Sequence, residues 1–349
     1  MTGERMKGER MKGELMAGEM AEQPDVLRGL LARRLEIVDQ LTQGTRDAPR
    51  GVVLVARGSS DNAAIYGRYV IEVASSLPVT IAAPSLVSVY RAPTDYRGFI
   101  AVAISQSGET PEIVTVLERL QEMGARGIAV TNSNDSPLAR AAHLVVGLDA
   151  GQERAVPATK TFTAQLAVFG FLAEALGSPP WIATDWESVP SAVAAVLADP
   201  SAARDVAERI GDAPGIICVG RGFLFPVALE AALKLKETSR ILAEGYSAAD
   251  LRHGPIAVVE EEFPVLIFAA HGPTLEDVQE LVATLQERRA RTFVVGDVPG
   301  ADVPVPGDLP EALGPIPAAV QAQLVALWLA RHRGLDPDRP SGLSKVTRT

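Results

Sequence analysis

An internal duplication constrains the fold of this chain more than any other feature of the sequence. Residues 51–58 read Gly-Val-Val-Leu-Val-Ala-Arg-Gly, and residues 215–222 read Gly-Ile-Ile-Cys-Val-Gly-Arg-Gly. The two segments start 164 residues apart (215 − 51), and the same offset carries Phe99 onto Phe263 and Thr110 onto Thr274. One offset that holds over about sixty residues indicates two copies of the same folding unit.

Each copy has the pattern of strand, glycine-rich turn, helix, strand, turn and helix. The strand segments are almost continuously apolar, as in Phe99–Ala103, which is typical of a parallel sheet covered on both faces. A chain of 349 residues is long enough for two domains of ordinary size. We therefore predict an α/β protein with two tandem, doubly wound, flavodoxin-like parallel-sheet domains.

The ends of the chain and the region between the copies suggest further divisions. The first twenty residues form four pentads, each with a central glycine and few large apolar residues, which predicts disorder. Apolar residues recur with helical spacing from Gln23 onward. The expected segments are a disordered tail (1–22), an N-terminal helix (23–45), a first domain (46–180), a connection (181–205), a second domain (206–335) and a C-terminal tail (336–349).

Composition excludes several classes of function. Apolar residues make up 47% and charged residues 22%, and the net charge is −10, which argues against nucleic acid or an anionic membrane as partner. No apolar run is long enough to span a membrane and no signal peptide is recognisable, so we expect a cytoplasmic protein. The single cysteine, Cys218, is expected in the core, and the four histidines lack zinc-ligand spacing, so no metal is expected.

A polar turn follows the apolar run at Phe99–Ala103. It reads Ile-Ser-Gln-Ser-Gly-Glu-Thr from 104 to 110, and Pro111 then opens a helical pattern. Unpaired N–H groups at a helix N-terminus favour an anion, and neutral hydroxyls and amides suit a monoester phosphate. The alternative is that these residues only cap the helix.

The second copy has lost these polar groups. At the shared offset, Ser105, Gln106 and Ser107 correspond to Ala269, Ala270 and His271, and Ser59 and Ser60 correspond to Phe223 and Leu224. We therefore expect one phosphate site in each chain, in the first copy.

The second copy carries ionisable residues of another kind. Glu230, Lys234 and Glu237 share one face of a predicted helix at spacings of four and three residues. This pattern also fits an exposed, salt-bridged helix face. His253 follows before Gly254-Pro255, in a loop, where catalytic groups often lie.

Five motifs follow one another along the chain: Ile104–Thr110, Ala158–Leu166, Ala228–Glu237, Arg252–Pro255 and Leu343–Val346. In this order they make the chain resemble the sugar isomerase (SIS) domain family, from about residue 46 to the C-terminus. The chain is similar to the isomerase half of glucosamine-6-phosphate synthase, which is built from two SIS domains. Residues 57–61 and 83–90 make it resemble more closely the stand-alone SIS-type glucosamine-6-phosphate deaminases.

The resemblance implies a role for each matched residue. Glu237 resembles the base that moves a proton between C1 and C2, with Lys234 one turn before it. His253 resembles the group that opens the sugar ring from the neighbouring subunit, which implies a homodimer, and Lys345 resembles the lysine that meets the C2 carbonyl. The residues implied to bind substrate are Ser60, Ser105, Gln106, Ser107 and Thr110 for the phosphate and Val156, Thr159 and Ser344 for the sugar.

The activity that this resemblance implies is conversion of glucosamine 6-phosphate to fructose 6-phosphate and ammonia, without a cofactor. No glutaminase half is recognisable, so glutamine-dependent synthesis is not expected. Two departures, Ala158 for serine and Ser344 for a small apolar residue, leave other phosphosugars open, for an isomerase, a fructosamine-phosphate deglycase or a dehydratase. A phosphosugar-sensing regulator is the alternative of another class, although such a sensor needs neither a base nor a ring-opening histidine.

Overall fold

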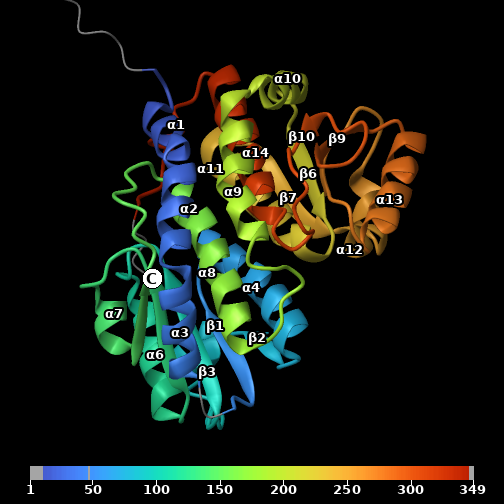
Figure 1. Cartoon of the computed structure of the whole chain (residues 1–349). Helices are drawn as coiled ribbons and strands as arrows, with labels where there is room; N and C mark the ends of the chain where they lie inside the picture. The colour runs from blue at the N-terminus through green and yellow to red at the C-terminus, as the bar shows by residue number, and fades with distance from the viewer. Residues whose placement is uncertain (1–10, 46–47, 346–349) are drawn as a thin grey trace, which may run out of the picture.

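The computed structural model of the chain describes residues 11–45 and 48–345. Within these residues the chain forms two parallel five-stranded sheets with helices packed around them (Figure 1). Three helices precede the first sheet: α1 (Glu14–Ala21), α2 (Gln23–Ala32) and α3 (Arg34–Gly44). The first half then contains β1 (Gly51–Val55), α4 (Ser59–Ser75), β2 (Val79–Ile81), α5 (Pro84–Ser88), β3 (Phe99–Ser105), α6 (Pro111–Glu122), β4 (Arg126–Thr131), α7 (Pro137–Ala141), β5 (Leu144–Gly147) and α8 (Lys160–Leu176).

Two helices connect the halves, α9 (Asp185–Ala198) and α10 (Ser201–Ile210). The second half contains β6 (Gly215–Gly220), η1 (Gly222–Leu224), α11 (Phe225–Ser239), β7 (Leu242–Ser247), α12 (Ala248–Arg252), η2 (Pro255–Val258), β8 (Pro264–Ala269), α13 (Leu275–Glu287), β9 (Arg291–Gly296), β10 (Val303–Pro304) and α14 (Pro315–His332). As Figure 1 shows, the first sheet lies at one end of the molecule and the second at the other, with α4, α8, α11 and α14 between them.

The strand order repeats the duplication. The first sheet has the order β2-β1-β3-β4-β5, and the second has β7-β6-β8-β9-β10, which is the same order in the second copy. Helices α6 and α13 start at Pro111 and Leu275, again 164 residues apart (275 − 111). The predicted fold of two doubly wound α/β domains is confirmed.

Side chains alternate between two cores along each central strand. In β1, Val52 and Leu54 face the core between the two sheets, whereas Val53 and Val55 face α6 on the outer side. In β6, Cys218 likewise faces the shared core, where burial raises the pKa of its thiol, so its predicted core position is confirmed. The helices between the sheets therefore belong to a single core that fixes the two halves against each other.

The first segment of the chain differs from the prediction. Residues 14–21 form helix α1, in which Met16 and Met20 are fully buried, so the disordered tail predicted for 1–22 is wrong over this part; residues 1–10 lie outside the described residues. The expected single helix at 23–45 is two helices that meet at Arg33. The glycine in this segment lowers its intrinsic helix propensity. Burial of Met16 and Met20 against the rest of the chain stabilises the helix by more than the glycine destabilises it.

The connection between the halves is also part of the core. Helix α9 buries Trp186 against Phe171 of α8, and the Trp186 indole donates a hydrogen bond to Glu174 at 2.7 Å. Over the described residues, we find no helix that is long and apolar enough to cross a membrane.

Candidate functional site

The first sheet reverses its strand order between β1 and β3, and two helices start at this point. Helix α4 starts at Ser59, directly after β1, and α6 starts at Pro111, after the turn that follows β3. In open parallel sheets, ligands bind beside such a switch point at the carboxyl ends of the strands. Both helix N-termini also present unpaired N–H groups there, which favours an anion.

A cavity of about 630 Å³ lies at this switch point. It is lined by the turns after β1 and β3, by helix α11 of the second half and by the C-terminal tail. The predicted site residues that line it are Ser60, Ser105, Gln106, Ser107, Thr110, Val156, Lys234, Glu237, Ser344 and Lys345. The fold thus brings together side chains that are up to 285 positions apart in the sequence (345 − 60).

Internal hydrogen bonds shape the polar turn. The Gly108 N–H donates to Ser105 Oγ at 3.1 Å, and the Glu109 N–H donates to Ser107 Oγ at 3.2 Å. Gly108 has a φ of +66°, and a Cβ at this position would lie 2.1 Å from Ser136 Oγ. The turn therefore needs glycine here, both for its backbone conformation and for space.

The corresponding turn of the second half is filled by a carboxylate. Thr274, which corresponds to Thr110, donates a hydrogen bond to Glu311 at 2.6 Å. A Cβ on Gly272 would lie 2.3 Å from Glu311 Oε2. This is consistent with the loss of the polar residues in the second copy.

Sequence reasoning missed an ion pair on the cavity wall. Arg57 donates to Glu112 from both Nε, at 3.0 Å, and Nη2, at 2.8 Å, and both residues line the cavity. The arginine lies two residues after the end of β1, and the duplicated Arg-Gly pair was the signal that could have identified it. Glu112 offsets the positive charge that Arg57 brings to the anion-binding end.

Helix α11 places three ionisable side chains beneath the cavity. The Lys234 ammonium donates to Glu237 and lies 3.6 Å from Glu230 Oε1. Lys234 and Glu230 are completely buried, whereas the Glu237 side chain is 22% exposed and lines the cavity. The alternative of a solvated helix face is therefore wrong for this group.

The electrostatics of this group follow from its burial. Burial raises the pKa of Glu230 to about 7, although the positive charge of Lys234 opposes the shift. Burial would lower the pKa of Lys234, but the two carboxylates outweigh it and the pKa is raised. Asn62 of α4 donates to Glu230 at 2.8 Å and so connects α11 to the helix that follows the first turn. Lys234 therefore stays charged and holds Glu237 at the cavity.

The C-terminal tail enters the cavity wall through an ion pair. Lys345 Nζ lies 2.8 Å from Glu153 Oε2, and the Glu153 side chain has no exposed surface. Burial acts to raise the pKa of Glu153, but Lys345 and hydrogen bonds from Thr159 and Thr161 outweigh it, so the pKa is lowered. Sequence reasoning missed Glu153, which stands alone in a loop.

Two predicted site residues lie elsewhere in the described structure. Thr159 is fully buried and its N–H donates to Glu153 at 2.9 Å, and it is not among the described residues that line the cavity, whereas the adjacent Ala158 is. His253 is exposed after α12 and is not among the described residues that line the cavity of its own chain.

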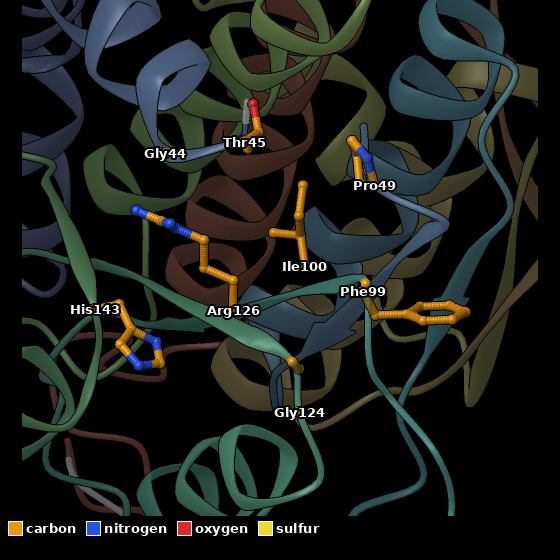
Figure 2. Close-up of a pocket in the computed structure, with 10 residues that line it drawn as sticks. Gly44, Thr45, Pro49, Phe99, Ile100, Gly124, Arg126 and His143 are labelled. Atoms are coloured by element: carbon orange, nitrogen blue, oxygen red, sulfur yellow. The ribbon is translucent and has the colours of Figure 1, made fainter. Parts of the chain in front are cut away.

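A second cavity, of about 490 Å³, lies at the amino ends of the strands of the first sheet, opposite the candidate site (Figure 2). It is formed where β3 and β4 begin, beside Arg126 and His143. The Gly127 N–H donates to His143 Nδ1 at 3.0 Å. The polar turns lie at the carboxyl ends of the strands, so this cavity is separate from the candidate site.

Comparisons with known proteins identify the family that the chain matches. The SIS domain family model matches residues 47–175 and 210–332. The chain is 32% identical over 352 residues to glutamine–fructose-6-phosphate aminotransferase (isomerizing) of Chlorobaculum tepidum, with 93% of this chain and 56% of that protein covered. The chain thus spans about half the length of the curated relatives it matches.

Two solved structures are similar over almost their whole length. A proposed phosphosugar isomerase from Silicibacter pomeroyi is 32% identical with a TM-score of 0.82, covering 93% of this chain and 99% of that one. Glucosamine-6-phosphate deaminase from Thermotoga maritima is 26% identical with a TM-score of 0.73, covering 91% and 100%. With two matched domains and the strand order repeated in both, the chain belongs to the SIS domain family.

Proposed function

We propose that this protein is a phosphosugar aldose–ketose isomerase that deaminates glucosamine 6-phosphate to fructose 6-phosphate and ammonia. One observation carries the proposal. A single cavity combines the polar turns of the first half with Lys234 and Glu237 of the second half and Lys345 of the tail. A phosphosugar sensor needs the turns but has no use for a carboxylate and two lysines at the other end of the ligand.

The phosphate group holds the substrate in the cavity and takes no part in the reaction itself. Two helix N-termini and the hydroxyls of Ser60, Ser105, Ser107 and Thr110 surround the end of the cavity where it is expected to bind. Binding energy from this non-reacting group positions C1 and C2 of the sugar against Glu237.

The reaction begins with ring opening, which we assign to His253, since histidine can donate and accept protons near neutral pH. Glu237 then takes the C2 proton of the open-chain amino aldose, and an enolamine forms. The same carboxylate returns the proton at C1, which leaves a C2 imine. Water adds to C2 and ammonia departs, so fructose 6-phosphate remains, and no electrons are gained or lost.

The lysines support these steps electrostatically. Lys234 remains charged and donates a hydrogen bond to Glu237, which holds this carboxylate in position to act as a base. Lys345 lines the same cavity, and we expect its ammonium to meet the C2 substituent of the sugar.

We also propose a homodimer in which His253 reaches the cavity of the partner chain. His253 is exposed and is not among the described residues that line the cavity of its own chain, which supports this arrangement. Val258, at the end of the neighbouring helix η2, is 58% exposed and offers apolar surface for such a contact.

Deamination is favoured over the other phosphosugar reactions by the similarity to the Thermotoga maritima deaminase, which the chain matches over that chain's full length. Purified protein incubated with glucosamine 6-phosphate at neutral pH should release ammonia and fructose 6-phosphate in equal amounts. Unphosphorylated glucosamine is the control and should react far more slowly. If the folded protein releases no ammonia, the proposal is wrong, and a panel of phosphosugars followed by NMR then identifies the substrate.

A further inference from the structure

Helix α1 contacts both segments that bring Lys345 to the cavity. At its N-terminus, the N–H groups of Leu15 and Met16 donate to the two carboxylate oxygens of Asp338 at 2.9 and 2.8 Å. These N–H groups have no partner within the helix, and a carboxylate is favoured there by the helix dipole. Asp338 is only 6% exposed and precedes Lys345 by seven residues (345 − 338) in the tail.

Helix α1 also contacts the loop before α8. Glu19, which is 5% exposed, accepts hydrogen bonds from the Arg154 N–H and from the Ala155 N–H, the latter at 3.2 Å. Glu153, the partner of Lys345, directly precedes these two residues, and Val156 of the cavity wall follows them. The buried carboxyl group of Glu19 thus fixes the stretch of backbone that carries Glu153 and Val156.

The loop and the tail also contact each other. The Val156 N–H donates to the carbonyl oxygen of Asp338 at 3.3 Å, and the Lys345 ammonium lies 2.8 Å from Glu153. Helix α1, the loop and the tail therefore form a closed arrangement of three segments. The carboxyl group of Glu19, which belongs to α1, and that of Asp338, which lies at the N-terminus of α1, are both buried.

We propose that α1 is a positioning element of the active site: through Glu19 and Asp338 it sets the loop and the tail so that Lys345 is docked on Glu153 at the cavity. Glu19 and Asp338 are positioning residues, because they act through backbone contacts and do not line the cavity. The proposal rests on the role of Lys345 in the proposed function. It also predicts that Lys345 is less well docked on Glu153 when Glu19 or Asp338 is changed, which can be measured without turnover.

The direct readout is the reactivity of the Lys345 amine in the full chain. Competitive acetylation with acetic anhydride, followed by mass spectrometry, should show a slow Lys345 in the wild type because the amine is ion-paired. Glu19→Ala and Asp338→Ala should raise its rate about tenfold, since each removes the hydrogen bonds that a buried carboxyl group accepts from the backbone. Exposed Lys236 is the internal reference, and Glu36→Ala, which deletes an exposed carboxylate of α3, is the matched control and should change nothing.

Kinetics with glucosamine 6-phosphate provide the second readout. In both variants kcat should fall about tenfold while KM changes little, because the phosphate turns are untouched. Glu19→Gln keeps one acceptor oxygen and should recover part of the loss, and circular dichroism checks that each variant is folded. If an alanine variant fails to fold, Glu19→Gln and Asp338→Asn are measured in its place, with smaller increases expected.

The two possible failures can be distinguished. Unchanged Lys345 acetylation in folded variants of both Glu19 and Asp338 would overturn the positioning role, whatever the substrate. Absence of turnover in the wild type, combined with the expected change in acetylation, would overturn the proposed function and leave the positioning role in place.

Discussion

The ammonium of Lys345 lies 2.8 Å from a carboxylate oxygen of Glu153, a side chain without exposed surface and 192 residues away in the sequence. The pair joins the last described residue of the chain to the loop that leads into α8. Because Glu153 also accepts from Thr159 and Thr161, its carboxylate is charged and held in place.

Loss of the lysine should destabilise the protein in a pH-dependent way. Lys345→Met leaves the Glu153 carboxylate buried without its cation, which should lower the free energy of unfolding by about 3 kcal/mol at pH 7. The lowered pKa of Glu153 contributes stability above its unfolded value of 4.5, and this contribution is lost as the pH falls through the folded value. The deficit of the variant should therefore shrink on acidification. Chemical denaturation at pH 7 and pH 4 measures it, with Lys236→Met as control, and equal losses in the two variants would argue against the pair.

Glu230 should make stability depend on pH in the opposite sense. Its pKa is raised from 4.5 to about 7, so its contribution is present below pH 4.5 and is lost as the pH rises toward 7. Glu230→Gln removes this titration while keeping an acceptor for Asn62. Compared with this variant, the wild type should lose unfolding free energy between pH 4.5 and 7. Parallel stability curves for the two proteins would contradict a buried, titrating Glu230.

The duplication supplies a matched pair of variants for the phosphate turn. Thr110→Ala removes a hydroxyl that lines the cavity, and should raise KM for the phosphosugar about tenfold through a lost hydrogen bond to an anion. Thr274→Ala changes the corresponding residue of the second half, where the hydroxyl binds Glu311, and should leave KM unchanged. Steady-state kinetics on both variants measure the two KM values. Similar effects of the two changes would mean that the turn of the first half has no special role.

Subunit mixing tests the placement of His253. Glu237→Gln and His253→Asn should each be inactive as homodimers. In mixed dimers one site carries both changes and the other carries neither, so random mixing should restore about a quarter of the wild-type activity. Mixing is confirmed by native mass spectrometry with one variant isotopically labelled. Formation of mixed dimers without recovered activity would show that His253 does not act across the interface.

The fold could be predicted from sequence because its signals are local and repeated. The alternation of apolar strands and glycine turns appears twice at one offset, and the strand order follows the same duplication. The polar turn at Ser105 was likewise visible, because its hydroxyls are adjacent in the chain and absent from the second copy.

Other parts of the site depend on contacts between distant residues and leave no local pattern. Helix α1 has a glycine in its sequence and is stabilised by buried methionines and by Asp338, 322 residues from Met16. Glu153 becomes recognisable only when the tail places Lys345 beside it. The burial of Lys234 likewise could not be read from spacing, because an exposed salt-bridged helix has the same pattern.

The proposed reaction depends on transfer of a proton between C1 and C2 of the phosphosugar by Glu237. NMR in D₂O follows this transfer, with fructose 6-phosphate and ammonium supplied as the products of the proposed reaction. The wild type should exchange a C1 hydrogen of fructose 6-phosphate for deuterium, and folded Glu237→Gln, which still binds the phosphosugar, should lose this exchange by at least about a hundredfold. Equal deuterium incorporation by the two proteins would show that Glu237 is not the base that transfers this proton.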